Sequence, residues 1–118
     1  MFRIVIPARY ASSRLPGKPL AAIAGKPMIE WVYERARATR AREVVIATDD
    51  ARIETVARGF GATVMMTAAE HASGTDRIAE VAARCGWAND EVVVNLQGDE
   101  PNLPAEIVEQ VAELLLAH

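Results

Sequence analysis

The chain has 118 residues, of which 51% are hydrophobic and only 5% aromatic, so we expect one domain with a core of small and branched side chains. Its net charge of −3 argues against tight binding of duplex DNA, which needs an extended basic face. The single cysteine, Cys85, excludes an internal disulfide and is typical of a protein from the reducing cytoplasm.

The first element is an apolar run, Phe2 to Ile6, which predicts a buried strand and is too short for a signal peptide or a membrane span. Residues 6–20 then carry basic side chains and no acid, with prolines, a glycine and hydroxyls that favour a loop. No acidic residue precedes Glu30, although the whole chain has 16 acidic residues. A solvated surface turn would explain these charges, but their gathering at one end of an acidic chain favours a phosphate site that includes Arg14 and Lys18.

Helical spacing of apolar residues after Pro27 predicts a helix that buries Ile29, Val32, Tyr33 and Ala36. The segment Glu43–Thr48 predicts a second buried strand, and Asp49 and Asp50 follow it. These two carboxylates either cap the next helix or bind a metal, and we favour capping.

The next helix has an apolar face formed by Ile53, Val56, Ala57 and Phe60, and the segment Ala62–Met66 predicts a third strand. A polar loop, residues 67–77, then opens a third helix lined by Ile78, Val81, Ala82 and Cys85. This pattern predicts that Cys85 is a buried thiol and not a nucleophile. Ser73 and Thr75 either cap this helix or bind a ligand, and capping is the simpler interpretation.

A fourth strand is predicted from Glu91 to Leu96, and the polar segment Gln97–Pro101 follows it. Asp99 comes after Gly98, so it is either a turn residue or a metal ligand. A final helix is predicted from the apolar residues Ile107, Val108, Val111, Leu114 and Leu115.

Alternating strands and helices predict an α/β fold over residues 1–118, a Rossmann-like parallel sheet of strand order 3-2-1-4 with helices on both faces. In this order the first and fourth strands are neighbours, and ligands bind at the carboxyl ends of such strands. A cationic loop opposite Asp99 therefore favours a metal role for Asp99, because cations on phosphates and a carboxylate on a divalent metal are typical of nucleotide transfer. Neither the Gly-x-Gly-x-x-Gly turn nor the Walker loop is present.

Three segments resemble the CMP-Kdo synthetase family, the 3-deoxy-manno-octulosonate cytidylyltransferases. They are Pro7-Ala8-Arg9 with Arg14-Leu15-Pro16-Gly17-Lys18-Pro19-Leu20, then His71-Ala72-Ser73-Gly74-Thr75-Asp76-Arg77, and Gln97-Gly98-Asp99-Glu100-Pro101. The resemblance runs from the first strand to the last helix. Sialic acid cytidylyltransferases and hexose-1-phosphate nucleotidyltransferases fit less well, because their loops after the first strand differ.

The resemblance implies transfer of CMP from CTP to the sugar acid Kdo, with Mg²⁺, which gives CMP-Kdo and pyrophosphate for lipopolysaccharide biosynthesis. It implies that the triphosphate is bound by Arg9, Arg14 and Lys18, and that the cytidine is framed by Ala8, Ser73, Gly74, Thr75 and Arg77. It also implies that Asp99 binds magnesium and that Gln97 faces the sugar acid. Arg14, Lys18 and Asp99 would then be the catalytic residues.

Members of this family are considerably longer, so the chain resembles the N-terminal, nucleotide-binding half of the family fold and looks truncated. Three alternatives to a complete enzyme follow: a CTP-binding fragment without turnover, a related sugar-acid nucleotidyltransferase, and a non-enzymatic α/β domain. We expect no nucleic-acid or membrane partner, a cytoplasmic location, and a homodimer or other self-association.

Overall fold

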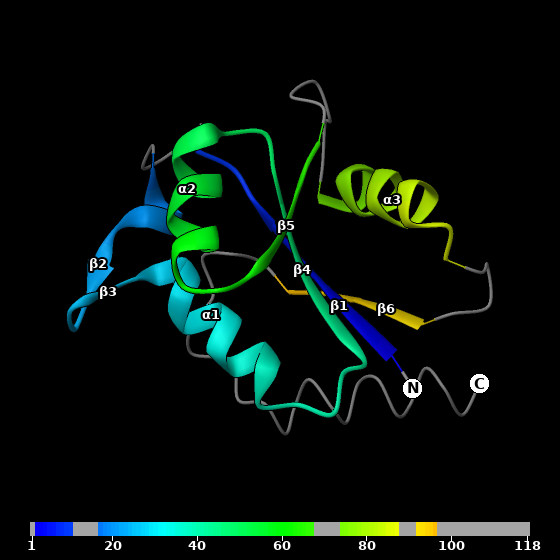
Figure 1. Ribbon diagram of the computed structural model, residues 1–118, viewed down its shortest axis with the longest axis horizontal. Helices are drawn as coiled ribbons and strands as arrows, with labels where there is room; N and C mark the ends of the chain where they lie inside the picture. The colour runs from blue at the N-terminus through cyan, green and yellow to red at the C-terminus, as the bar shows by residue number, and fades with distance from the viewer. Residues whose placement is uncertain (1, 11–16, 68–73, 88–91, 97–118) are drawn as a thin grey trace.

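The computed structural model describes residues 2–10, 17–67, 74–87 and 92–96. Within these residues a parallel sheet is built from β1 (Phe2–Ala8), β4 (Glu43–Thr48), β5 (Thr63–Met66) and β6 (Val92–Asn95). The strands lie in the order β5-β4-β1-β6, which confirms the predicted order 3-2-1-4 (Figure 1). The predicted final helix and the segment Gln97–Pro101 lie outside the described residues.

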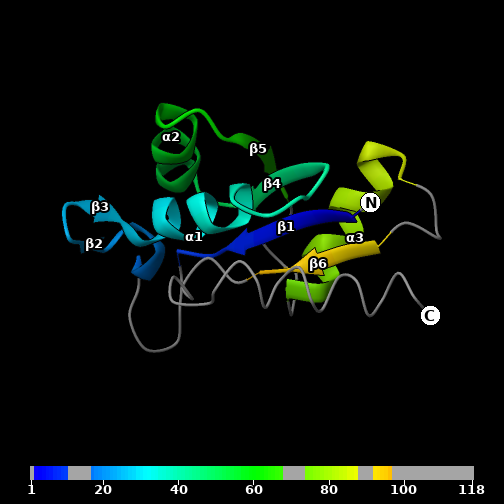
Figure 2. The same ribbon diagram turned by 90° about the horizontal axis from the view of Figure 1, so that it is seen from below.

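Helices cover both faces of this sheet, as predicted. Helices α1 (Met28–Arg37) and α2 (Ala51–Gly59) pack on one face, and α3 (Gly74–Cys85) packs on the other (Figures 1 and 2). In the part of the chain that the structure describes, no helix is both long and apolar enough to cross a bilayer.

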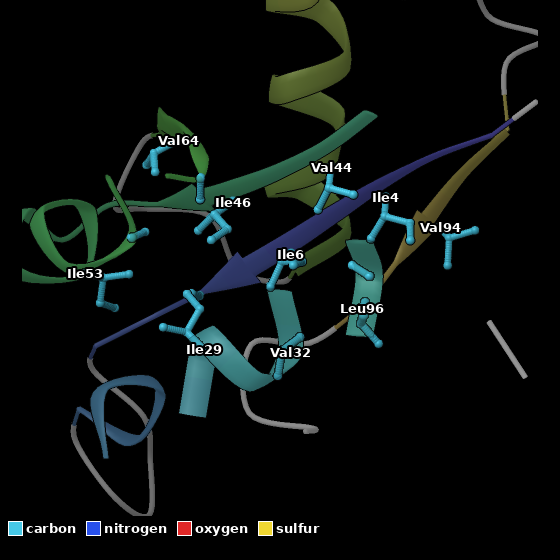
Figure 3. Packing of buried hydrophobic residues seen from close by; sticks show 14 of the residues in the cluster. Ile4, Ile6, Ile29, Val32, Val44, Ile46, Ile53, Val64, Val94 and Leu96 are labelled. Carbon is cyan, nitrogen blue, oxygen red and sulfur yellow. The ribbon is translucent and has the colours of Figure 1, made fainter. Parts of the chain in front are cut away.

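The core follows from the alternation of side chains along β1. Ile4 and Ile6 point to the face that α1 and α2 cover, whereas Val5 points to the face that α3 covers. On the first face they belong to one hydrophobic cluster with Ile29 of α1 and Ile53 of α2, whose side chains are drawn in Figure 3. Burial of each such side chain stabilises the fold by about 1.5–3 kcal/mol, so these contacts hold both helices rigidly against the sheet.

A short hairpin was not predicted. It consists of β2 (Ala22–Ile23) and β3 (Lys26–Pro27), and Ala24 and Gly25 form its turn with φ angles of 50° and 85°. Two positive φ values are typical of a tight hairpin turn, but alanine there gives no sequence signal for one. The predicted helix nevertheless begins at Met28, directly after Pro27.

The prediction that Cys85 is buried is wrong. The thiol belongs to an exposed residue at the end of α3, whereas Val81, one turn earlier, is fully buried. The spacing of apolar residues identifies which face of a helix points inward. It does not show how far along the helix the elements that cover this face extend. The last residue of the face therefore lies in solvent.

Asp50 caps α2, as the sequence predicted for one or both carboxylates at this point. Its Oδ1 accepts hydrogen bonds from the backbone N–H of Arg52 at 2.8 Å and of Ile53 at 3.2 Å. Its carboxylate also accepts from the guanidinium of Arg52, with Nη2 at 2.8 Å from Oδ2. The Arg52 hydrogen bond is the main reason why the pKa of Asp50 lies below its usual value.

We expect Asp50→Ala to lower the free energy of unfolding at neutral pH by about 1 kcal/mol, the usual cost of a lost cap. Because the folded-state pKa of Asp50 is depressed, its carboxylate stabilises the fold above the unfolded pKa, and this stabilisation is lost as pH falls through the folded pKa. The difference between wild type and variant should therefore shrink in urea titrations as the pH is lowered below the usual range of an aspartate pKa. Asp50→Asn, which keeps the cap, is the control, and a difference independent of pH would contradict the charge-based account.

Candidate functional site

The carboxyl ends of three strands meet at one edge of the sheet. Ala8 of β1 pairs with Thr48 of β4, which in turn pairs with Met66 of β5. On the other side of β1, the backbone N–H of Leu96 donates to the carbonyl of Val5 at 3.1 Å. The loops that follow β1, β4 and β5 therefore leave the sheet side by side, as expected for a ligand site in a parallel α/β fold.

The structure brings Arg9 and Lys18 of the predicted phosphate loop to the same place. The backbone N–H of Gly17 donates to the carbonyl of Tyr10 at 2.6 Å, so the residues just inside Arg9 and Lys18 are hydrogen-bonded to each other. Arg9 is exposed, and none of the described carboxylates forms an ion pair with it. The two cations thus flank one loop at the carboxyl edge of β1.

The loop re-enters the fold through a single turn of 3-10 helix, η1 (Lys18–Leu20). Gly17 precedes it with φ of 75°, a left-handed conformation that glycine adopts without strain. Pro19 is buried, and Leu20 packs against the main hydrophobic cluster. The second half of the Leu-Pro-Gly-Lys-Pro-Leu motif therefore anchors the backbone of Lys18 to the core.

Arg77 lies fully buried at the same edge. Its Nη1 donates to Oγ1 of Thr67, and its Nη2 lies 3.6 Å from Oδ2 of Asp49. These contacts connect the first turns of α3 to the ends of β4 and β5. A cation near the N-terminus of a helix is unfavourable in the field of the helix dipole, and the carboxylate of Asp49 offsets this.

Sequence reasoning did not foresee the Asp49–Arg77 pair. The sequence pattern predicts a capping role for Asp49 and Asp50, with metal binding as the alternative. The structure separates their roles. Asp50 caps α2 on one face of the sheet, whereas Asp49 pairs with Arg77 of α3, the helix on the other face. Only the three-dimensional arrangement brings Arg77 to Asp49, so no local pattern signals this pair.

The remaining predicted site residues stay predictions. Arg14, Ser73, Gln97 and Asp99 lie outside the described residues. Gly74 and Thr75 form the first turn of α3, and Ala8 is buried at the end of β1. Among the described residues, no group of three or more His, Cys, Asp and Glu side chains could hold a metal ion.

A hollow of about 270 Å³ on the outer side of α1 is lined by Trp31, Glu34, Arg35 and Ala38. It contains none of the predicted site residues. Lys26 and Trp31 beside it are engaged with each other, since the ammonium lies 4.4 Å from the centre of the indole ring. We therefore place the candidate site at the carboxyl edge of the sheet and not here.

Comparison with protein families settles the class of this fold. A family model described as cytidylyltransferase matches residues 3–118. The chain belongs to the cytidylyltransferase family. The resemblance predicted from three motifs is therefore confirmed at the level of the family.

Individual relatives narrow the likeness to one group of cytidylyltransferases. The chain is 64% identical, over 99% of its length, to a 3-deoxy-manno-octulosonate cytidylyltransferase of Thioalkalivibrio sulfidiphilus, and 61% identical to one of Pseudomonas fluorescens. It matches 47% and 46% of these two proteins. A solved CMP:2-keto-3-deoxy-manno-octonic acid synthetase complexed with CTP superposes with a TM-score of 0.90 and 48% identity over 98% of this chain and 47% of that one. The chain thus spans about half the length of the relatives it matches.

We expect Asp49→Ala to lower the free energy of unfolding by about 2 kcal/mol, because buried Arg77 loses a carboxylate partner. This is below the ~3–5 kcal/mol typical of a fully buried pair, since the Asp49 side chain is 20% exposed. The matched control is Glu54→Ala, which removes the exposed pair with Arg58 on α2 and should cost about 0.5 kcal/mol or less. Equal losses in the two variants, measured by urea unfolding, would show that the Arg77 pair contributes no more than a surface pair.

Proposed function

We propose that this chain binds CTP at the carboxyl edge of the sheet and acts as a cytidylyltransferase, transferring CMP to Kdo with release of pyrophosphate for lipopolysaccharide biosynthesis. The observation that supports this most strongly is the likeness, over nearly the whole chain, to a synthetase of this kind that was solved with CTP. The likeness covers the region after β1, where Arg9, which is exposed, and Lys18 lie next to the hydrogen-bonded residues Tyr10 and Gly17. Cations in such a position suit a triphosphate.

In this proposal the site works by positioning and by charge. Arg9, Arg14 and Lys18 bind the triphosphate oxygens while the anomeric hydroxyl of Kdo attacks the α-phosphate in line. The bond from the α-phosphate to the leaving pyrophosphate breaks as the new ester bond forms, and the hydroxyl proton is released. Negative charge grows on the bridging and leaving oxygens, and preorganised cations stabilise it. No covalent bond to the protein is needed.

Magnesium belongs to this proposal as the ion that would neutralise phosphate charge when bound. Oxygen donors are what magnesium prefers, and it is usually held by one or two carboxylates together with substrate phosphates. Asp99 is the proposed ligand, with Gln97 toward the sugar acid. Asp49 and Asp50 are less suited, because the first faces Arg77 and the second is engaged by Arg52 and the α2 backbone.

We also propose that Ser73, Gly74 and Thr75 frame the cytidine together with Ala8. In this proposal Arg77 contributes by fixing the first turn of α3, which contains Gly74 and Thr75. The Arg77 side chain is fully buried against Thr67 and Asp49, two or three residues along α3 from Thr75 and Gly74. Its contacts fix the first turn of the helix relative to the sheet. The cytidine would then meet a rigid turn of backbone.

CTP binding without turnover is the second candidate function. The cations Arg9 and Lys18 beside the loop neck and the start of α3 at the same edge of the sheet support this proposal. The chain spans about half the length of the relatives that it matches. Self-association, in which β6 or its neighbourhood contacts a second copy, is a further proposal that light scattering tests.

Calorimetry with CTP, UTP, ATP and GTP in the presence of magnesium tests the proposed nucleotide. We expect CTP to bind most tightly, because a framed base is read by its own hydrogen-bonding edge. A pyrophosphate-release assay with CTP and Kdo then separates the two candidate functions. Release that depends on both substrates supports transfer, and CTP binding without release supports the binding module. Equal affinity for all four nucleotides would contradict the cytidine-specific site.

Lys18→Ala should weaken CTP binding by about 1.5–3 kcal/mol, the typical value of a hydrogen bond to a charged group. Lys26→Ala is the matched control, because Lys26 lies on the hairpin, bonded to Glu34 at 2.7 Å and stacked on Trp31. It should leave the CTP affinity unchanged. Arg14→Ala should resemble Lys18→Ala, and Arg14→Lys should restore binding only in part, because a lysine lacks the guanidinium fork. Unchanged affinity in both alanine variants would contradict the phosphate site.

A further inference from the structure

The neck of the phosphate loop is held by more than one backbone hydrogen bond. Tyr10 and Gly17, which share the 2.6 Å hydrogen bond, also pack closely against each other. A Cβ added to Gly17 would lie 2.9 Å from Cε2 of the Tyr10 ring, closer than real Cβ atoms approach other atoms, and 3.1 Å from Cζ, which is tighter than most Cβ contacts. Only glycine therefore allows the ring to lie against this point of the chain.

The same ring carries a second partner from a different element. The guanidinium carbon of Arg52, near the start of α2, lies 3.3 Å from the centre of the Tyr10 ring. Such a distance is well within the range of a cation–π interaction. Arg52 is itself oriented by Asp50, which accepts from its Nε at 3.2 Å and from its Nη2 at 2.8 Å.

These contacts form a connected series from the loop neck to a rigid helix cap. Asp50 is fixed by the backbone of α2, Arg52 is fixed by Asp50, and Tyr10 lies between Arg52 and Gly17 in the series. Tyr10 is also partly buried against the main hydrophobic cluster. The backbone that leads into and out of the loop is thereby tied to the core.

We propose that Tyr10, Gly17 and Arg52 form a clamp that positions Arg9 and Lys18 for the triphosphate. The clamp rests on the proposed function, since its role is to preorganise two cations of that site. Arg9 and Lys18 are the residues next to Tyr10 and Gly17, one on each side of the neck. Holding both in place before the ligand arrives removes part of the entropic cost of ordering them on binding.

Arg52 acts here through Tyr10 and not as a phosphate ligand. Two of its guanidinium nitrogens donate to Asp50, and the guanidinium group lies over the Tyr10 ring. The side chain is 60% exposed, so its removal leaves no cavity in the core. Its variant removes the contact with Tyr10 and also the charge that offsets Asp50, and the double variant with Tyr10→Ala separates these two effects.

The test measures binding of CTP and of inorganic tripolyphosphate, which carries the phosphates without the cytidine, to variants of the chain. Arg52→Ala and Tyr10→Ala should each weaken both ligands by roughly 3–10-fold, whereas Tyr10→Phe, which keeps the ring, should stay within about 2-fold of wild type. Arg58→Ala is the control for Arg52→Ala, because Arg58 makes a comparable exposed ion pair on the same helix.

Glycine variants test the close contact separately from backbone strain. Gly17→Ala combines a positive φ of 75° with the clash against Tyr10, while Gly61→Ala has a φ of 88° and open space around the added Cβ. Both should lose thermal stability, but only Gly17→Ala should lose affinity for tripolyphosphate. Equal affinity losses in the two would overturn the clamp, because strain alone would then explain them.

A double variant decides between a clamp and a direct ligand. If Arg52 acts through Tyr10, the double variant Tyr10→Ala/Arg52→Ala should lose about as much ligand affinity as either single variant. If Arg52 contacts phosphate itself, the losses should multiply, and the clamp is overturned. The outcomes separate the clamp from the proposed function. If the wild-type chain binds tripolyphosphate but does not prefer CTP, the proposed function is contradicted, and the clamp is still supported when the clamp variants lower the tripolyphosphate affinity. If the wild-type chain binds CTP and Arg52→Ala has the same CTP affinity as Arg58→Ala, the proposed function is supported and the clamp is overturned.

Discussion

The buried central position of β1 is the constraint on which the rest of this structure depends. All seven side chains of the strand are buried, and β4 and β6 pair with it from either side. The charged residue Arg3 lies near the start of the strand and pairs with Glu43 at 3.1 Å, whereas the polar residues of the candidate site begin only where the strand ends, at Arg9 and Tyr10. Because neighbouring strands are parallel, the polar segments after β4 and β5 emerge at the same edge. One apolar run thus determines both the core and the location of the site.

Two consecutive aspartates, Asp49 and Asp50, fix different helices to that edge of the sheet. Asp50 caps α2 on one face of the sheet and orients Arg52, while Asp49 faces Arg77, which comes from α3 on the other face. Adjacent residues thereby tie both helical layers to the end of β4. This arrangement explains why each carboxylate has an arginine of its own. Deleting one arginine would leave its aspartate as an extra negative charge beside the proposed triphosphate site, so stability and ligand affinity are linked through the same pairs.

Patterns that are local in sequence predicted most of the fold. The strand order, the helices on both faces and the buried residues Ile29, Val32 and Ala36 follow from apolar periodicity and strand–helix alternation. The motif around Lys18 gave the place of the candidate site and the family. The hairpin at Ala24, the exposure of Cys85 and the Asp49–Arg77 pair could not be predicted. The first depends on an alanine in an unusual conformation, the second on where packing ends, and the third on a contact between distant segments.

The charge at the carboxyl edge shows why such an acidic chain can offer a site for a polyanion. Repulsion by exposed carboxylates would oppose a triphosphate, and Asp49 and Asp50 stand at the end of the strand next to β1. Both have side chains that are at most 20% exposed, and both lie in ion pairs with arginines, so their fields are largely cancelled close to their source. Arg9, in contrast, forms no ion pair with any described carboxylate and remains exposed. The local potential is therefore set by the loop cations and not by the net charge of −3.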